Sequence, residues 1–168
     1  GAVCVDYGCG TLRLGIHVIN YLQPSAYWGF DVADFLLEEG RRLIGEELWR
    51  HKRPNLRVIS PASIAEVAAR NPTMLFSITV FDHVHPNELS EYFKNILAII
   101  GSDGQALVTG RWTDQETVQY SGRCWAHSVG RVKSLISALG GRMEKLSEEV
   151  SPFQGCENGK RGVLRVTQ

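Results

Sequence analysis

The sequence predicts a single α/β domain of three layers, with a seven-stranded, mostly parallel sheet that includes an antiparallel C-terminal strand. Short β-rich runs alternate with amphipathic helical segments along most of the 168 residues, which is typical of parallel strands joined by crossover helices. No helical segment separates the last two strand-like runs, so we expect these two to pair antiparallel. A chain of this length can bury a sufficient core without a disulfide or a metal ion.

The first two expected strands, residues 2–6 and 27–31, flank a short helix that ends at Pro24 and Ser25. The apolar positions of this helix recur at helical spacing, at Leu12, Ile16, Ile19 and Leu22. A second helix follows the second strand, and the polar segment 47–55 forms its end and a loop. Its buried face is predicted to carry Val32, Leu36, Leu43 and Ile44.

The third and fourth expected strands, residues 56–60 and 74–79, flank a short helix that ends before Pro72. That helix buries Ile64, Val67 and Ala68. The fourth strand is apolar throughout, as expected for burial on both faces. The longest apolar stripe of the chain follows it and predicts a buried helix. The members of this stripe are Leu89, Tyr92, Phe93, Ile96, Leu97 and Ile100.

The fifth expected strand, residues 105–110, begins after two glycines that end the preceding helix. The polar run 113–123 after it is the longest candidate loop or insertion. A last helix ends at Gly140 and Gly141 and buries Val129, Val132, Leu135, Ile136 and Leu139. The final strands are expected at residues 142–150 and 162–167.

Composition argues against several classes of function. The 18 Lys and Arg residues balance the 18 Asp and Glu residues, so the chain lacks the basic excess typical of nucleic-acid binding. The four scattered cysteines form no CxxC pair, so neither a zinc site nor a disulfide framework is expected. A cytoplasmic location is the default for such a chain. No apolar run approaches the roughly 18 residues of a membrane span, so no membrane partner is expected.

The turn after the first strand is the expected ligand site. In an open α/β sheet, ligands bind outside the carboxyl ends of the strands, where the strand order reverses. Gly8, Cys9 and Gly10 allow a ligand to approach the backbone closely and place amide groups near a helix N-terminus. Asp31 ends the second strand, where a carboxylate can accept hydrogen bonds from both hydroxyls of a ribose.

Two classes of cofactor use such an arrangement. A dinucleotide site requires GxGxxG, but Arg13 occupies the position of the third glycine, which disfavours NAD. A cofactor that carries an amino-acid cation and no phosphate favours a carboxylate at the end of the first strand, where Asp6 stands. S-adenosylmethionine fits that description.

Three segments, residues 3–10, 27–32 and 76–84, together resemble the motifs of the small-molecule subgroup of the class I S-adenosylmethionine-dependent methyltransferases. Residues 3–10, VCVDYGCG, resemble the family's glycine-rich first motif, and residues 27–32, YWGFDV, resemble the second. Residues 76–84, FSITVFDHV, are similar to the motif after the fourth strand, and the resemblance covers essentially the whole chain. It implies a Rossmann-like domain over residues 1–168 that lacks the family's helix before the first strand. It also implies methyl transfer to an oxygen or nitrogen of a small-molecule acceptor.

The resemblance assigns roles to individual residues. Asp6 and the backbone of the glycine turn would hold the methionine part of the cofactor, and Asp31 would hold the ribose. The backbone of Ser77 and Ile78 would line the side of the sulfonium. The expected cofactor-binding residues are therefore Asp6, Gly8, Cys9, Gly10, Asp31, Val32, Ser77 and Ile78.

Three positions depart from the family pattern. Leu12 replaces a frequent glycine, Thr73 stands where a carboxylate often precedes the fourth strand, and residues 60–63 lack the acidic adenine contact. These departures leave two alternatives to the methyltransferase interpretation. One is a non-catalytic binding domain of a larger protein, and the less favoured one is a nicotinamide-linked oxidoreductase.

His83 is the predicted catalytic residue. It follows the fourth strand, where a neutral imidazole could accept a proton from a hydroxyl or amine acceptor. The alternative is that His83 only orients the loop. A metal site formed with Asp82 and His85 is disfavoured because a further ligand is missing, and no metal ion is expected.

Two further segments carry open interpretations. His127 is expected to be structural, at the N-terminus of the last helix, with Ser128 as the cap. Arg111, Trp112 and the run 113–123 follow the fifth strand, where they could line an acceptor pocket or form a solvated loop.

Overall fold

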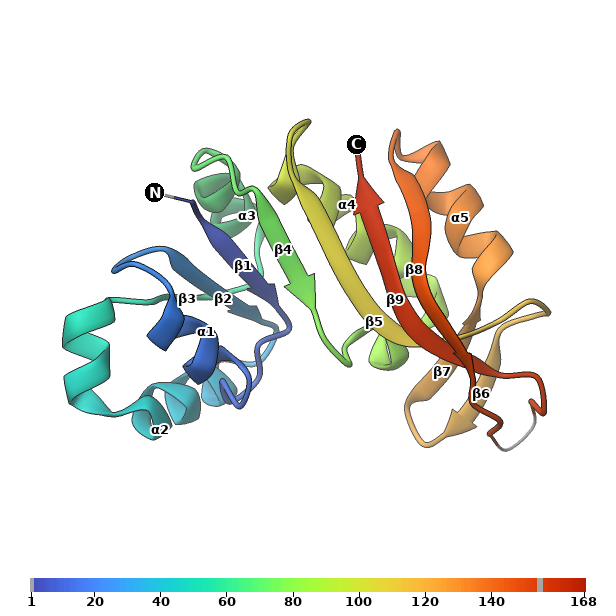
Figure 1. The fold of residues 1–168 in the computed structure, drawn as a ribbon, viewed down its shortest axis with the longest axis horizontal. Helices are drawn as coiled ribbons and strands as arrows, with labels where there is room; N and C mark the ends of the chain where they lie inside the picture. Colours follow the sequence, from blue (N-terminus) through green and yellow to red (C-terminus); the bar gives the residue numbers. More distant parts are fainter. Residues whose placement is uncertain (1, 154–155) are drawn as a thin grey trace.

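A computed structural model describes residues 2–153 and 156–168 and contains a central mixed sheet (Figure 1). Five strands run parallel: β1 (Cys4–Tyr7), β2 (Tyr27–Asp31), β3 (Asn55–Val58), β4 (Met74–Ser77) and β5 (Gln105–Thr113). The sheet continues with β9 (Lys160–Thr167), which is antiparallel to both of its neighbours, β5 and β8 (Arg142–Val150). Within the described residues the sheet has nine strands rather than the predicted seven: seven follow the order β3-β2-β1-β4-β5-β9-β8, and a two-stranded hairpin joins the end of β5. The order of the seven confirms the predicted three-layer, Rossmann-like fold with an antiparallel C-terminal strand.

Helices cover both faces of this sheet (Figure 1). On one face, α1 (Gly15–Tyr21) and α2 (Asp34–Lys52) contribute to the smaller of two apolar cores. On the other face, α3 (Pro61–Ala68), α4 (Leu89–Ile100) and α5 (Val129–Ala138) contribute to the larger core. None of the helices in the described ranges is both long enough and apolar enough to cross a membrane.

The apolar stripe in α4 forms the centre of the larger core. All six residues that the sequence predicted to be buried there are buried, together with Ile99. Helix α3 buries two of its predicted residues, Ile64 and Val67, and α5 buries Val132 and Ile136. These helices pack against one face of the sheet and thereby leave the carboxyl ends of its parallel strands free for the loops that bear the site.

Helix α2 differs from the prediction in its extent and in its buried face. It runs to Lys52 through a kink at Gly45, where φ is 77° and ψ is 157°, so most of the expected loop 47–55 is helical. Its buried residues are Leu37, Gly40 and Ile44, and the predicted Val32 and Leu43 are exposed. Neither residue is displaced by the kink, since Val32 precedes the helix and Leu43 lies on its exposed side, one residue before the buried Ile44.

The expected loop 113–123 contains half of a β-hairpin. Strand β5 extends to Thr113 and is followed by β6 (Val118–Ser121) and β7 (Cys124–Ser128), which pair antiparallel. The end of β5 pairs with β7 through Trp112 and His127. His127 is therefore a fully buried strand residue directly before the N-cap position of α5, which agrees with the expected structural role. Ser128 is the N-cap residue of α5, but its side chain makes no capping hydrogen bond.

Candidate functional site

The strand order reverses beside β1, because the chain first builds β2 and β3 on one side of it and then places β4 on the other. Such a reversal leaves a crevice at the carboxyl ends of the strands, where α/β proteins bind ligands. We call the carboxyl ends of β1, β2 and β4 the cofactor edge. Every residue that the sequence assigned to cofactor binding lies at this edge or within a few residues of it.

The glycine turn, residues 8–10, is hydrogen-bonded to the end of β2. The amides of Gly8 and Cys9 both donate to the carbonyl oxygen of Phe30, at 2.7 and 2.9 Å. Gly8 and Gly10 have φ of 87° and 53°, in the left-handed region that favours glycine. A Cβ on Gly8 would collide with Val80, whereas a Cβ on Gly10 would meet no atom within 4 Å. Gly8 thus permits internal packing, and Gly10 borders open space that a ligand can use.

Asp31 connects β2 to the same turn. Its Oδ2 accepts a hydrogen bond from the amide of Gly10 at 2.9 Å, and its Oδ1 accepts one from the amide of Ala33 at 3.1 Å. A carboxylate offers about four acceptor positions, so each oxygen can still accept a ribose hydroxyl. Val32, beside it, is 79% exposed and offers apolar surface to a ligand.

Asp6 lies beneath the glycine turn and is buried. Its Oδ2 accepts a hydrogen bond from the Tyr27 hydroxyl at 2.7 Å. Burial raises the pKa of Asp6 to about 7, while the Tyr27 hydrogen bond acts in the opposite direction and the nearby Asp31 charge raises the pKa further. A cation bound at the cofactor edge would favour the ionised form. The two carboxylates predicted for the site are therefore brought together, one below the turn and one at its rim.

Leu12 explains how the turn tolerates the loss of a family glycine. The residue has φ of 62°, so it adopts the left-handed conformation that a glycine would adopt there. This conformation costs roughly 1–2 kcal/mol for a residue with a side chain. The Leu12 side chain is fully buried in the smaller core, against Gly40. Its burial offsets the backbone cost, so the departure from the family pattern does not imply a different turn.

Ser77 and Ile78 lie at the end of β4, next to β1. Ser77 is fully buried, and its Oγ donates to the carbonyl oxygen of Tyr7 at 2.7 Å and accepts from the Tyr92 hydroxyl at 2.8 Å. The first bond connects the ends of β1 and β4, and the second connects β4 to α4. Ile78 is half-buried against the smaller core. The backbone after Ser77 is thus held beside the end of β1, the position expected for residues that line the sulfonium side of the cofactor.

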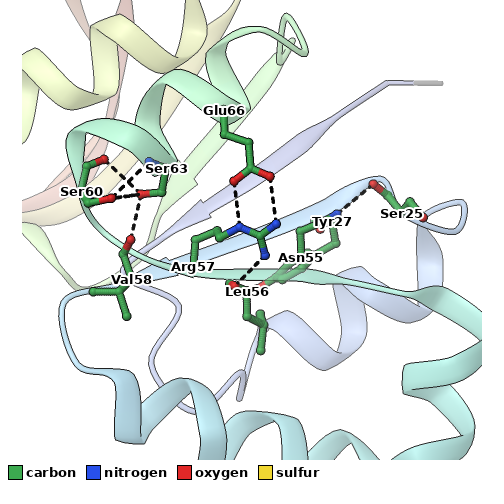
Figure 2. Close-up of polar contacts among 9 residues, drawn as sticks. All are labelled: Ser25, Tyr27, Asn55, Leu56, Arg57, Val58, Ser60, Ser63 and Glu66. Atoms are coloured by element: carbon green, nitrogen blue, oxygen red, sulfur yellow. Dashed lines mark hydrogen bonds and ion pairs between the residues drawn. The ribbon is translucent and has the colours of Figure 1, made fainter.

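Next to the cofactor edge, the polar groups at the end of β3 form hydrogen bonds within the protein (Figure 2). Ser60 and Ser63 form a reciprocal capping box that starts α3, and the Ser63 hydroxyl also donates to the Val58 carbonyl oxygen at 2.8 Å. Nearby, Arg57 forms a bidentate ion pair with Glu66. No acidic residue occupies positions 60–63. An adenine at this end would therefore meet exposed apolar surface such as Val58 in place of a carboxylate.

His83 lies on η1 (Phe81–His83), the short 3₁₀ helix after β4. Its side chain is exposed, and its Nδ1 is 3.4 Å from the Sγ of Cys124. Asp82 instead accepts hydrogen bonds from the Arg111 amide at 2.6 Å and the Tyr120 hydroxyl at 2.9 Å. His85 packs edge-on against a tryptophan ring. Within residues 2–153 and 156–168, no cluster of His, Cys, Asp and Glu side chains could hold a metal ion.

A cleft of about 530 Å³ opens between the segment after β4, the end of β5 and the β8–β9 pair. We call it the acceptor cleft, and its lining includes Thr79, Asp82, Thr109, Arg111, Glu149 and Arg161. Arg111 was a candidate from the sequence, but Trp112 points into the core and donates to Glu148 at 2.9 Å. Sequence reasoning missed the contacts of Tyr120 and Cys124, because no pattern indicates that the hairpin folds back over η1.

The fold is that of the class I S-adenosylmethionine-dependent methyltransferases. No family profile and no curated protein match the sequence. The chain is 15% identical to magnesium protoporphyrin IX methyltransferase from Synechocystis PCC 6803, solved with S-adenosylmethionine bound, with a TM-score of 0.65 over 100% of this chain and 71% of that one. A TehB-like methyltransferase from Corynebacterium glutamicum is 17% identical, with a TM-score of 0.64 over 100% and 80%. The [4+2]-cyclase SpnF is 12% identical, with a TM-score of 0.74 over 100% and 75%.

Proposed function

We propose that this chain binds S-adenosylmethionine at the cofactor edge and transfers its methyl group to an oxygen or nitrogen of a small molecule. The observation that carries the proposal is the junction of the glycine turn with Asp31. One carboxylate both fixes Gly10 beside open space and keeps acceptor positions for ribose hydroxyls. Two structural neighbours are named as methyltransferases, and one was solved with S-adenosylmethionine, which supports this choice of cofactor.

The residues at the edge fit this cofactor. The open space at Gly10 admits the methionine chain close to the backbone, and Asp6 supplies negative charge beneath it for the ammonium group. Asp31 receives the ribose, Val32 offers apolar surface to the adenine side, and the backbone at Ser77 and Ile78 borders the sulfonium side. When bound, the cofactor supplies an electrophilic methyl group. The protein's own contribution is to align the acceptor and exclude water, which can supply several kcal/mol.

The acceptor cleft has the size of a small-molecule site. Ligand pockets commonly measure about 300–1,000 Å³, and this one measures about 530 Å³. Its lining includes Asp82 of η1, and His83 is the next residue of that short helix, outside the lining itself. In the tautomer that carries its proton on Nδ1, beside Cys124 Sγ, Nε2 is the nitrogen that can accept a proton from the acceptor; in the other tautomer Nδ1 is the accepting nitrogen. We assign His83 as the general base for acceptors that are protonated before transfer.

The likeness to SpnF favours a second candidate function. SpnF is named as a [4+2]-cyclase and has a higher TM-score than either methyltransferase above. This chain could likewise use the fold for a reaction other than methyl transfer, or bind the cofactor without catalysis. Incubation with S-adenosylmethionine that carries an isotopically labelled methyl group, over a panel of phenols, carboxylates and amines, distinguishes the candidates. Label in an acceptor supports methyl transfer, and tight binding without label in any acceptor supports the second candidate.

Asp31→Asn should weaken binding of S-adenosylhomocysteine about tenfold or more, because each charge-assisted hydrogen bond contributes about 1.5–3 kcal/mol. Isothermal titration calorimetry measures the affinity. The matched control is Asp34→Asn, an exposed carboxylate at the start of α2, which should leave affinity within about twofold of the native chain. Equal affinities for both folded variants would remove Asp31 from the cofactor site.

His83→Ala should lower the turnover number about a hundredfold with a hydroxyl or protonated amine acceptor, because it removes the base. The affinity for S-adenosylhomocysteine should change little, since His83 borders the acceptor and not the cofactor. The measurement is the pH profile of turnover, from pH 6 to 9, beside calorimetry on the same variant. Native turnover throughout this range would leave His83 with a loop-orienting role only.

A further inference from the structure

A thiol and an imidazole lie in contact at η1, the short helix whose Asp82 lines the acceptor cleft. Cys124 is the first residue of β7 and is partly exposed, and His83 is the last residue of η1 and is exposed. The distance of 3.4 Å between Cys124 Sγ and His83 Nδ1 is within hydrogen-bonding range for sulfur. The two residues are 41 positions apart in the chain, so tertiary structure alone brings them together.

A polar network fixes the two segments that carry this pair. Asp82, the neighbour of His83, accepts hydrogen bonds from the Arg111 amide and from the Tyr120 hydroxyl. The Arg111 guanidinium donates to the same hydroxyl at 3.0 Å and lies 5.1 Å from the centre of the tyrosine ring. Tyr120 belongs to β6, which pairs with β7. The end of β5, η1 and the hairpin are thus joined, which holds Cys124 against His83.

The surroundings of Cys124 suit activation of a thiol. The thiolate is the reactive form of cysteine, and an adjacent histidine or a nearby cation promotes it. His83 supplies a nitrogen that can take the thiol proton. The Arg111 guanidinium donates to Tyr120 of β6, the strand that pairs with the Cys124 strand, and so supplies a cation on this side of the hairpin. The two features come from different elements, η1 and β5, so they are independent contributions.

The other three cysteines have different surroundings. Burial, with the Asp6 charge as the smaller cause, raises the pKa of Cys4 to about 11. Burial also raises the pKa of Cys9, and the charges of Asp6 and Asp31 add to the effect. Cys156 is buried. A reagent should therefore select Cys124 by access and by chemistry together.

We propose that Cys124 and His83 form a thiol–imidazole pair that makes Cys124 a covalent modification site for soft carbon electrophiles, such as alkyl halides and α,β-unsaturated carbonyl compounds. With iodoacetamide, the Cys124 thiol gives its proton to His83 Nδ1, Sγ bonds to the methylene carbon, and the carbon–iodine bond breaks to release iodide. With an unsaturated carbonyl compound, Sγ bonds to the β-carbon and the proton passes to the α-carbon. The inference does not rest on methyl transfer.

Alkylation of the intact chain by iodoacetamide, without cofactor or acceptor, tests the pair. Peptide mass spectrometry follows each cysteine separately. At pH 7, Cys124 should react at least about tenfold faster than Cys4, Cys9 or Cys156. His83→Ala should slow Cys124 about tenfold, whereas His85→Ala, which removes another exposed histidine of the same segment, should change its rate less than about twofold.

The pH dependence separates loss of the base from loss of local structure. In His83→Ala, the rate at Cys124 should recover at pH 9, where solvent base removes the thiol proton. Similar rates at all four cysteines would overturn the proposal, as would an unchanged Cys124 rate in His83→Ala. A rate that rises at every pH in this variant would also overturn it, because His83 would then only shield the thiol.

Discussion

Gly10→Val should abolish measurable binding of S-adenosylhomocysteine while the chain stays folded. A valine side chain at this position would fill the space where a Cβ now meets no atom within 4 Å and where the cofactor is proposed to lie. Retention of φ near 53° adds backbone strain of roughly 1–2 kcal/mol, which a stable domain survives. Calorimetry measures the binding, and circular dichroism measures the melting temperature without cofactor.

Gly140→Val is the matched control for this change. Gly140 has φ of 86°, its Cβ would also meet no atom within 4 Å, and it lies after α5, away from the cofactor edge. We expect Gly140→Val to lose about as much stability as Gly10→Val but to bind S-adenosylhomocysteine with the affinity of the native chain. If both variants bind S-adenosylhomocysteine equally well, Gly10 does not border the ligand.

Asp6→Asn should raise the free energy of unfolding at pH 8 while it weakens cofactor binding. The folded-state pKa of Asp6 is raised to about 7 from an ordinary 3.8, so between these values the folded chain holds a proton that the unfolded chain releases. Its contribution to stability is therefore fully present below about pH 4 and is lost as pH rises toward 7, up to about 4 kcal/mol. The neutral amide avoids this loss and can still accept the Tyr27 hydrogen bond.

Urea unfolding at pH 5 and pH 8, without cofactor, measures both parts of this expectation. The native chain should lose stability over this range relative to Asp6→Asn. S-adenosylhomocysteine should bind the variant about tenfold more weakly or worse, because its ammonium group loses a charged partner. If the free energy of unfolding changed with pH equally in the native chain and in Asp6→Asn, Asp6 would not carry a buried charge. If the affinity for S-adenosylhomocysteine were unchanged, Asp6 would not contact the cofactor.

The features of the fold that could be predicted follow from side-chain periodicity and from the order of the elements along the chain. The stripe from Leu89 to Ile100 predicted α4, because six apolar residues at helical spacing leave few other arrangements. The pairing of β8 with β9 followed from the absence of a helix between them. The positions of Gly10 and Asp31 at one edge followed from their places at the ends of adjacent parallel strands.

The remaining features depend on contacts that sequence spacing does not encode. Strand β6 is short and polar, and it gains its order from its pairing with β7 and its contacts with η1. The left-handed backbone of Leu12 could not be predicted, because leucine residues rarely adopt this conformation. The contact of Cys124 with His83 requires the hairpin to fold back over η1.

Calorimetric titration of the chain with S-adenosylmethionine, S-adenosylhomocysteine and NAD in parallel tests the central claim most directly. The proposed site has two carboxylates around a glycine turn and no third glycine for a pyrophosphate, since Arg13 takes that position. The first two ligands should therefore bind one to one, and NAD should not bind. Binding of NAD in preference to the other two, or no binding of either S-adenosyl compound to the folded chain, would contradict the assignment.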